Sequence, residues 1–111
     1  MVNLNTSCNE INHTFTDTER NKLCKDFKLC DKALDYPVEI IDKILRLNLI
    51  IKLYFEKRKD AEKELKVKQS SLSRYMRGVA CTPHSLAKRI KNDPKFMIKD
   101  IEDICYCLND L

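Results

Sequence analysis

The chain has 111 residues, 43% of them hydrophobic, and a formal net charge of +4 at pH 7. Such a length supports one domain with a modest core, and no apolar run approaches the roughly 18 to 20 residues that cross a bilayer. The N-terminal residues have neither a basic start nor an apolar stretch, so we expect no secretory signal and a cytoplasmic protein.

The N-terminal part is predicted to be an arm followed by a helix. Residues 1–15 are polar and lack periodicity, which indicates a flexible arm. The stretch TDTE at 16–19 has the Thr-x-x-Glu spacing of a capping box, with Thr16 as the N-cap. Apolar residues then recur at spacings of 4, 3 and 4, at Leu23, Phe27, Cys30 and Leu34. We therefore predict one helix over 16–36.

A second, strongly apolar helix is predicted from Pro37 to about Glu56. Proline favours the first helical position, where its missing N–H leaves no bond unmade. The apolar residues that follow it have helical spacing: Val38, Ile41, Ile44, Leu45, Leu49 and Tyr54. Because the whole chain has one glycine and three prolines and is rich in Lys, Glu, Leu and Ile, sheets are disfavoured and we expect an all-α fold.

The charge is distributed unevenly along the chain. Residues 57–91 hold 11 Lys and Arg against 3 Asp and Glu, a net charge of +8. Residues 1–56 have a net charge of −1 and residues 92–111 of −3. A basic segment between neutral and acidic ones favours a polyanionic partner. The alternative is that its lysines only solvate a helical surface.

Apolar spacing within the basic segment predicts a bend. Leu65 and Val67 are two residues apart, so one helix would place them about 200° from each other. Both reach one core, together with Leu72 and Tyr75, if a helix ends at Leu65 and another begins at about Gln69. That arrangement is a helix-turn-helix.

The stretch DAEKELKVKQSSLSRYMRGVACTPHSLAKRI, residues 60–90, resembles the lambda-repressor/Cro-like (XRE) family of helix-turn-helix DNA-binding domains. The resemblance covers about residues 42–91, and Lys66 stands where the family commonly has glycine in the turn. It implies a DNA-binding domain over 37–92. The expected fold is an all-α helix-turn-helix bundle with an additional N-terminal helix and a C-terminal helix.

The helix at about 69–77 is the predicted recognition helix, which would enter the major groove with its N-terminus first. Gln69 can pair with adenine, and Arg74 can reach guanine or phosphate. Leu72 and Tyr75 are expected to face inward, and Gly78 to end the helix in a left-handed conformation. Alternatively, the polar residues at 69–71 are ordinary N-terminal caps and Arg74 is a solvated side chain.

The next helix is predicted to begin with Thr82 as N-cap and Pro83 as first helical residue. Its N-terminus would lie beside the recognition helix, where phosphate could bind. The complete set of predicted DNA-binding residues is Lys68, Gln69, Ser70, Ser71, Ser73, Arg74, Arg77, Thr82, His84 and Lys88.

Residues 93–111 are predicted to form an acidic C-terminal helix. Its apolar residues keep a narrow 4-3-4 seam, at Met97, Ile101, Ile104 and Leu108. Such a seam suits helix pairing between two copies, so we expect a homodimer. The alternative is that this helix, like the one over 16–36, covers the chain's own core.

The six cysteines lack Cys-x2-Cys spacing, and only two histidines accompany them, so we expect no metal site and no cofactor. Free thiols are the expected state, with disulfides as the alternative. The sequence has no glycine-rich phosphate loop and no nucleophile with a histidine at a recognised spacing. We therefore expect no enzyme and no small-molecule substrate.

Two functions remain from the sequence. The first is a sequence-specific double-stranded DNA-binding protein, acting as a transcriptional regulator. The second is a helical protein-interaction module, antitoxin-like or a virus or plasmid accessory factor, whose helix-turn-helix serves assembly only. Neither function requires a membrane.

Overall fold

The computed structural model of the chain describes residues 14–96 and 103–110, and these form helices and turns without a strand. The elements are α2 (Asp17–Asp26), η1 (Asp31–Asp35), α3 (Val38–Tyr54), α4 (Arg58–Leu65), α5 (Gln69–Arg77), α6 (His84–Asn92) and η3 (Leu108–Asp110), where η marks a 3-10 helix. The predicted all-α fold is confirmed.

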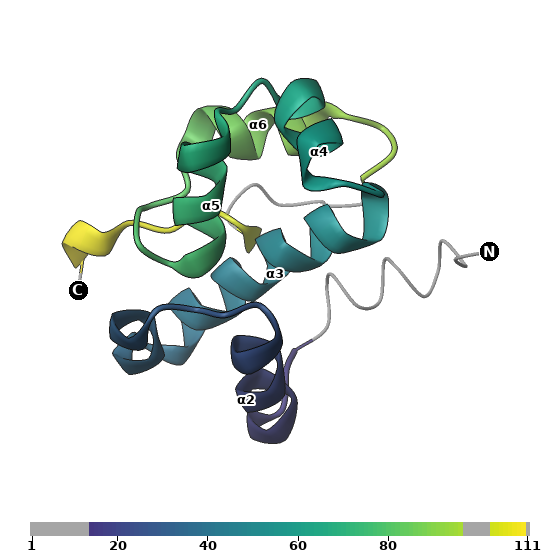
Figure 1. Cartoon of the computed structure of the whole chain (residues 1–111). Coiled ribbons are helices and arrows are strands. Elements are labelled where there is room, and N and C mark those ends of the chain that lie inside the picture. The colour runs from purple at the N-terminus through teal and green to yellow at the C-terminus, as the bar shows by residue number, and fades with distance from the viewer. Residues whose placement is uncertain (1–13, 97–102, 111) are drawn as a thin grey trace.

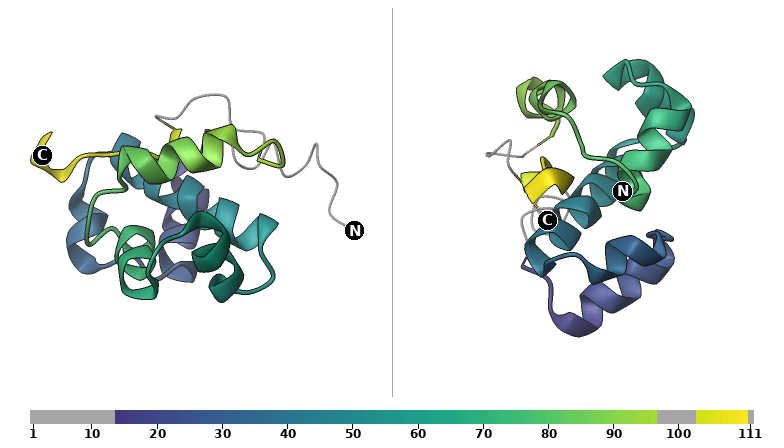
Figure 2. Two further views of the ribbon diagram at one scale, coloured as in Figure 1. Left: turned by 90° about the horizontal axis from the view of Figure 1, so that it is seen from above. Right: turned by 90° about the vertical axis from the view of Figure 1, so that its left-hand side faces the viewer.

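The helix α3 is the centre of the molecule. In Figure 1 it crosses the middle, with α4, α5 and α6 on one side and α2 with η1 on the other. Figure 2 shows α6 on one flank of α3 and the α4–α5 pair on the other flank. Nine residues of α3 are buried, on more than one face, because the helix is covered from both sides.

Two hydrophobic clusters result from this arrangement. The helix-turn-helix core joins α3 to α4, α5 and α6, and includes Leu47, Ile50, Ile51, Ala61, Leu65, Leu72, Met76, Leu86 and Ile90. The N-terminal core joins α3 to α2 and η1, and includes Phe15, Cys24, Leu29, Ala33, Tyr36, Ile41, Ile44, Leu45 and Leu49. Phe15 is 6% exposed, so the end of the predicted flexible arm is packed; residues 1–13 of that arm lie outside the described residues.

The predicted helix over 16–36 is two elements. It begins as expected, since Thr16 and Glu19 form the capping box. It ends at Asp26, because Lys28 has a left-handed backbone (φ 56°) and the Leu29 N–H donates to the Cys24 carbonyl at 3.1 Å. The chain then turns into η1, and Leu34 lies exposed instead of on the predicted apolar face.

The prediction of a single C-terminal helix that reaches Leu108 is wrong. Residues 93–96 form a turn and residues 105–107 are not helical. Ile104 and Cys105 are buried in the helix-turn-helix core, and Tyr106 is buried in the N-terminal core. These tertiary contacts, and not helical periodicity, determine the conformation of the segment. Two residues of the predicted seam, Met97 and Ile101, lie outside the described residues.

Candidate nucleic-acid interface

The bend predicted between Leu65 and Gln69 is confirmed. The helix α4 ends at Leu65 and α5 begins at Gln69. Between them Lys66 is left-handed (φ 55°), and the Val67 N–H donates to the Glu62 carbonyl at 2.9 Å. Leu65 and Val67 both pack on the helix-turn-helix core, as the spacing required. Lys66 thus takes the backbone conformation that glycine would adopt without strain.

Arg89 of α6 holds this turn in place. Its Nη1 donates to the Leu65 carbonyl at 2.6 Å and to the Lys66 carbonyl at 3.2 Å. The guanidinium therefore satisfies carbonyls at the end of α4, where intrahelical donors run out. Helical periodicity does not link residues 23 positions apart, so the sequence pattern could not predict this bond.

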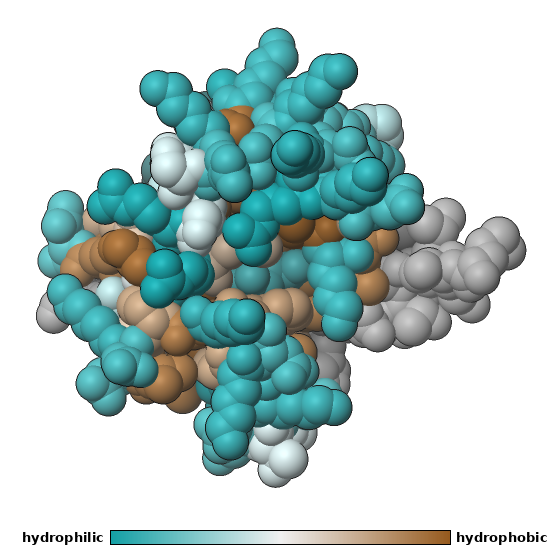
Figure 3. Space-filling model, viewed as in Figure 1, coloured by the Kyte–Doolittle hydropathy of each residue, from teal (hydrophilic) through white to brown (hydrophobic). Residues whose placement is uncertain are grey.

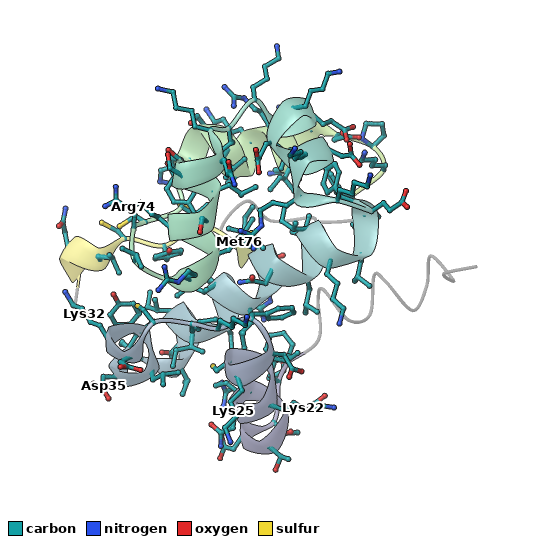
Figure 4. The ribbon with its side chains drawn as sticks, viewed as in Figure 1. Lys22, Lys25, Lys32, Asp35, Arg74 and Met76 are labelled. Carbon is teal, nitrogen blue, oxygen red and sulfur yellow. The ribbon has the colours of Figure 1, made fainter. Side chains whose placement is uncertain are left out.

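The helix α5 is divided into a core face and an outer face. Leu72 and Met76 are buried and Tyr75 is half-buried against the same core, so the predicted inward side is confirmed, with Met76 in addition. Figure 4 shows Arg74 and Met76 on different sides of α5. Most of the predicted recognition residues lie exposed at the end or on the outer face of α5: Lys68, Gln69, Ser70, Arg74 and Arg77; Ser71 and Ser73 are partly exposed.

The N-terminal end of α5 is open. Lys68 is its N-cap residue and makes no side-chain capping bond. Within residues 14–96 and 103–110, the side chains of Gln69, Ser70, Ser71 and Ser73 have no hydrogen-bond partner. The side chains of these residues therefore do not cap α5. Their polar groups, and the positive end of the helix dipole, face outward.

The C-terminal end of α5 is anchored by four donors, which come from the two ends of η1, from α3 and from the C-terminal segment. The Tyr75 carbonyl accepts from the Tyr106 hydroxyl at 3.2 Å, and the Met76 carbonyl accepts from Asn48 Nδ2 at 2.7 Å. The Arg77 carbonyl accepts from the Cys30 N–H at 3.0 Å, and the Gly78 carbonyl accepts from the Tyr36 hydroxyl at 3.1 Å. The Tyr106 hydroxyl also donates to the Ala80 carbonyl. The additional N-terminal and C-terminal segments thus fix the position of α5.

Gly78 ends α5 in the left-handed conformation that was predicted, with φ 78°. It has a second role that the sequence did not indicate. A Cβ at this position would lie 2.8 Å from Ala33 Cβ and 3.0 Å from Ile44 Cδ1. Only glycine lets the end of α5 lie this close to η1 and α3.

Eight exposed cations lie on α4, in the turn and on α5: Lys57, Arg58, Lys59, Lys63, Lys66, Lys68, Arg74 and Arg77. Arg74 and Arg77 belong to the last turn of α5. Of the acidic residues on α4, Glu64 pairs with Lys95 at 2.6 Å, so it neutralises a cation from outside this group. Figure 3 shows hydrophilic residues over the α4 and α5 side of the molecule. We call these eight residues the basic face; the other three cations of the basic segment, Lys88, Arg89 and Lys91, lie on α6.

The predicted role of Thr82 is wrong. Its side chain is 1% exposed, so it cannot contact DNA. The N-cap of α6 is Pro83 and the first helical residue is His84, and Thr82 is buried in the loop that joins α5 to α6. The His84 ring is exposed and lies 3.5 Å from the Cys105 thiol. Lys88, one turn further, is exposed on α6.

Among the described residues, Cys24, Cys30, Cys81, Cys105 and Cys107 are thiols that form no disulfide. No group of three or more potential metal ligands lies together in residues 14–96 and 103–110. In the same part of the chain, no helix is both long and apolar enough to span a bilayer.

In comparisons with known proteins, no family model, no curated protein and no solved structure matches this chain.

Proposed function

We propose that this chain is a sequence-specific double-stranded DNA-binding protein that regulates transcription, with α5 reading the major groove. One observation carries the proposal: the polar side chains in the N-terminal half of α5 have no hydrogen-bond partner within residues 14–96 and 103–110, while its C-terminal end is anchored by four donors. Base readout needs adaptable side chains on a rigidly held helix.

The charge of the basic face supports the same function. Its lysines and arginines lie exposed on α4, in the turn and on α5, where they could contact phosphates beside the major groove. Phosphate contacts position a protein on the duplex, whereas Gln69 and Arg74 offer planar groups that pair with base edges. The two kinds of contact would come from one side of the molecule.

Selection from a pool of random duplexes, followed by titration of the selected site at two salt concentrations, tests the proposal. We expect a preferred site, and an affinity that falls by about 0.9 log units per log unit of salt for each phosphate contacted. No enrichment of any sequence, or no binding at low salt, would overturn it.

We also propose that two copies bind DNA together, since one recognition helix contacts few bases and such domains commonly occupy half-sites about one turn apart. The interface cannot be the C-terminal seam expected from the sequence, because Ile104 is 1% exposed within its own chain. Light scattering on the full chain, free and with a selected duplex, tests this. One copy per duplex would contradict it.

A further inference from the structure

A cleft opens on the side of the molecule that bears α2. It has a volume of about 570 Å³ and lies between α2, the segment that follows it and the start of α3. Its lining residues are Arg20, Asn21, Cys24, Lys25, Lys28, Leu29, Leu34 and Ile41. Small-molecule sites in proteins commonly have volumes of about 300 to 1,000 Å³, so the cleft is large enough for a small ligand.

The floor of the cleft is apolar. Cys24, Leu29 and Ile41 are all buried, and Leu34 adds an apolar wall that is half-exposed. Burial raises the pKa of the Cys24 thiol, which keeps this group uncharged. A ligand that enters the cleft therefore meets hydrocarbon and a neutral thiol at its base.

The rim of the cleft is cationic. Arg20 is already neutralised, since it donates to Asp42 at 2.7 Å and to Asp17 at 2.8 Å. Lys25 and Lys28 are exposed, and neither forms an ion pair with a residue in the described ranges. The two lysines thus leave positive charge above an apolar floor. That combination is complementary to an anion with an apolar body.

Lys28 also has an unusual backbone. It is one of two non-glycine residues with positive φ among the described residues, at 56°. This left-handed residue ends α2, where the Leu29 N–H donates to the Cys24 carbonyl at 3.1 Å. The bend at Lys28 is what brings its side chain to the rim beside α2 and directs the chain toward η1.

The wall of the cleft is connected to the end of α5. Cys30, next to the lining residue Leu29, donates its N–H to the Arg77 carbonyl at 3.0 Å. In η1, Ala33 leaves no room for a side chain at Gly78. A ligand that moves residues 28–34 would therefore act on the anchored end of the recognition helix.

We propose that this cleft binds a small organic carboxylate with an apolar body, with the carboxylate at Lys25 and Lys28 and the body over Leu29, Leu34 and Ile41, and that the ligand acts on the position of α5. Its effect on DNA binding rests on the proposed function; the site itself does not.

A titration of the 15N-labelled full chain with sodium octanoate, followed by amide chemical shifts, tests the site without DNA. We expect shifts in residues 24–34 and, through the Cys30 bond, at Arg77 and Gly78. The neutral analogue 1-octanol should bind more weakly, because it lacks the charge that Lys25 and Lys28 complement.

Three variants test the rim. Lys25→Gln removes one charge, and Lys28→Asn removes the other while keeping a residue that tolerates positive φ. Each should weaken octanoate about threefold, the effect of a partly exposed ion pair. Lys22→Gln is the matched control, since Lys22 lies on the same helix but does not line the cleft; Figure 4 shows Lys22 and Lys25 on different sides of α2.

The outcomes separate the two proposals. Absence of shifts in residues 24–34, equal binding of octanol, or equal weakening by Lys22→Gln would overturn the carboxylate site. Shifts in the cleft without any at Arg77 or Gly78 would overturn the connection to α5. If octanoate binds as expected but no duplex is ever bound, the site stands and the proposed function falls.

Discussion

Gly78 is the residue on which the position of α5 depends most directly, because its positive φ and its contact with Ala33 both exclude a side chain. We expect Gly78→Ala to lower the free energy of unfolding by about 2 to 4 kcal/mol, the sum of a left-handed alanine and a steric overlap. Urea unfolding measures it. Val79→Ala, at an exposed position, is the control and should change stability by less than about 0.5 kcal/mol.

Lys66 presents the opposite case, a left-handed residue where glycine would be unstrained. We expect Lys66→Gly to raise the free energy of unfolding by up to about 1 kcal/mol, because relief of strain exceeds the added entropy of the unfolded chain. Lys68→Gly removes the same charge at an ordinary φ of −68° and should not stabilise. Thermal unfolding of both variants tests this prediction. Equal changes in stability for Lys66→Gly and Lys68→Gly would mean that loss of charge, and not relief of backbone strain, is responsible.

At the scale of elements, α5 combines an open end and an anchored end. We expect Gln69→Ala and Arg74→Ala each to weaken binding to a selected site by about 1 to 3 kcal/mol, with less effect on other sequences. Lys88→Ala should weaken binding to all sequences about equally, since we expect this lysine of α6 to contact DNA phosphates and not base edges. Fluorescence anisotropy with selected and scrambled duplexes measures both. Unchanged affinity and preference in Gln69→Ala would place readout elsewhere on the molecule.

The anchor from α3 can be tested separately from readout. Asn48 is 2% exposed and donates to the Met76 carbonyl, so Asn48→Leu leaves that carbonyl without its donor. We expect a loss of about 1 to 3 kcal/mol in the free energy of unfolding. Chemical denaturation measures it. A fully stable Asn48→Leu variant would show that the bond does not hold α5.

At the scale of the whole molecule, the C-terminal segment is joined to α5 through the Tyr106 hydroxyl, which donates to the Tyr75 carbonyl. Burial raises the pKa of Tyr106 above its ordinary value of about 10. The folded chain therefore retains this proton more strongly than the unfolded chain, so stability falls as pH rises above about 10. In Tyr106→Phe we expect a loss of about 1 to 2 kcal/mol at neutral pH and a shallower alkaline decline.

Unfolding of both chains by urea at neutral pH and above pH 10 tests the Tyr106 prediction. The decline will not vanish in the variant, because burial also raises the pKa of Tyr36. Equal alkaline slopes for the two chains would contradict the assignment of this proton to Tyr106.

The sequence by itself determined the local features. The all-α class, the capping box at Thr16, the bend after Leu65 and the glycine end of α5 all depend on residues within a few positions of one another. Helical periodicity and backbone preference act over that range, so they could be read without a structure.

The tertiary structure alone decided which surfaces remain free. Thr82 and Ile104 have suitable local patterns for a cap and a seam, yet both are buried, because burial depends on segments far away in the chain. The Arg89 bond to the turn and the four anchors of α5 join residues 23 to 47 positions apart. Helical periodicity cannot predict such pairs, because the fold alone determines which residues far apart in the sequence come into contact.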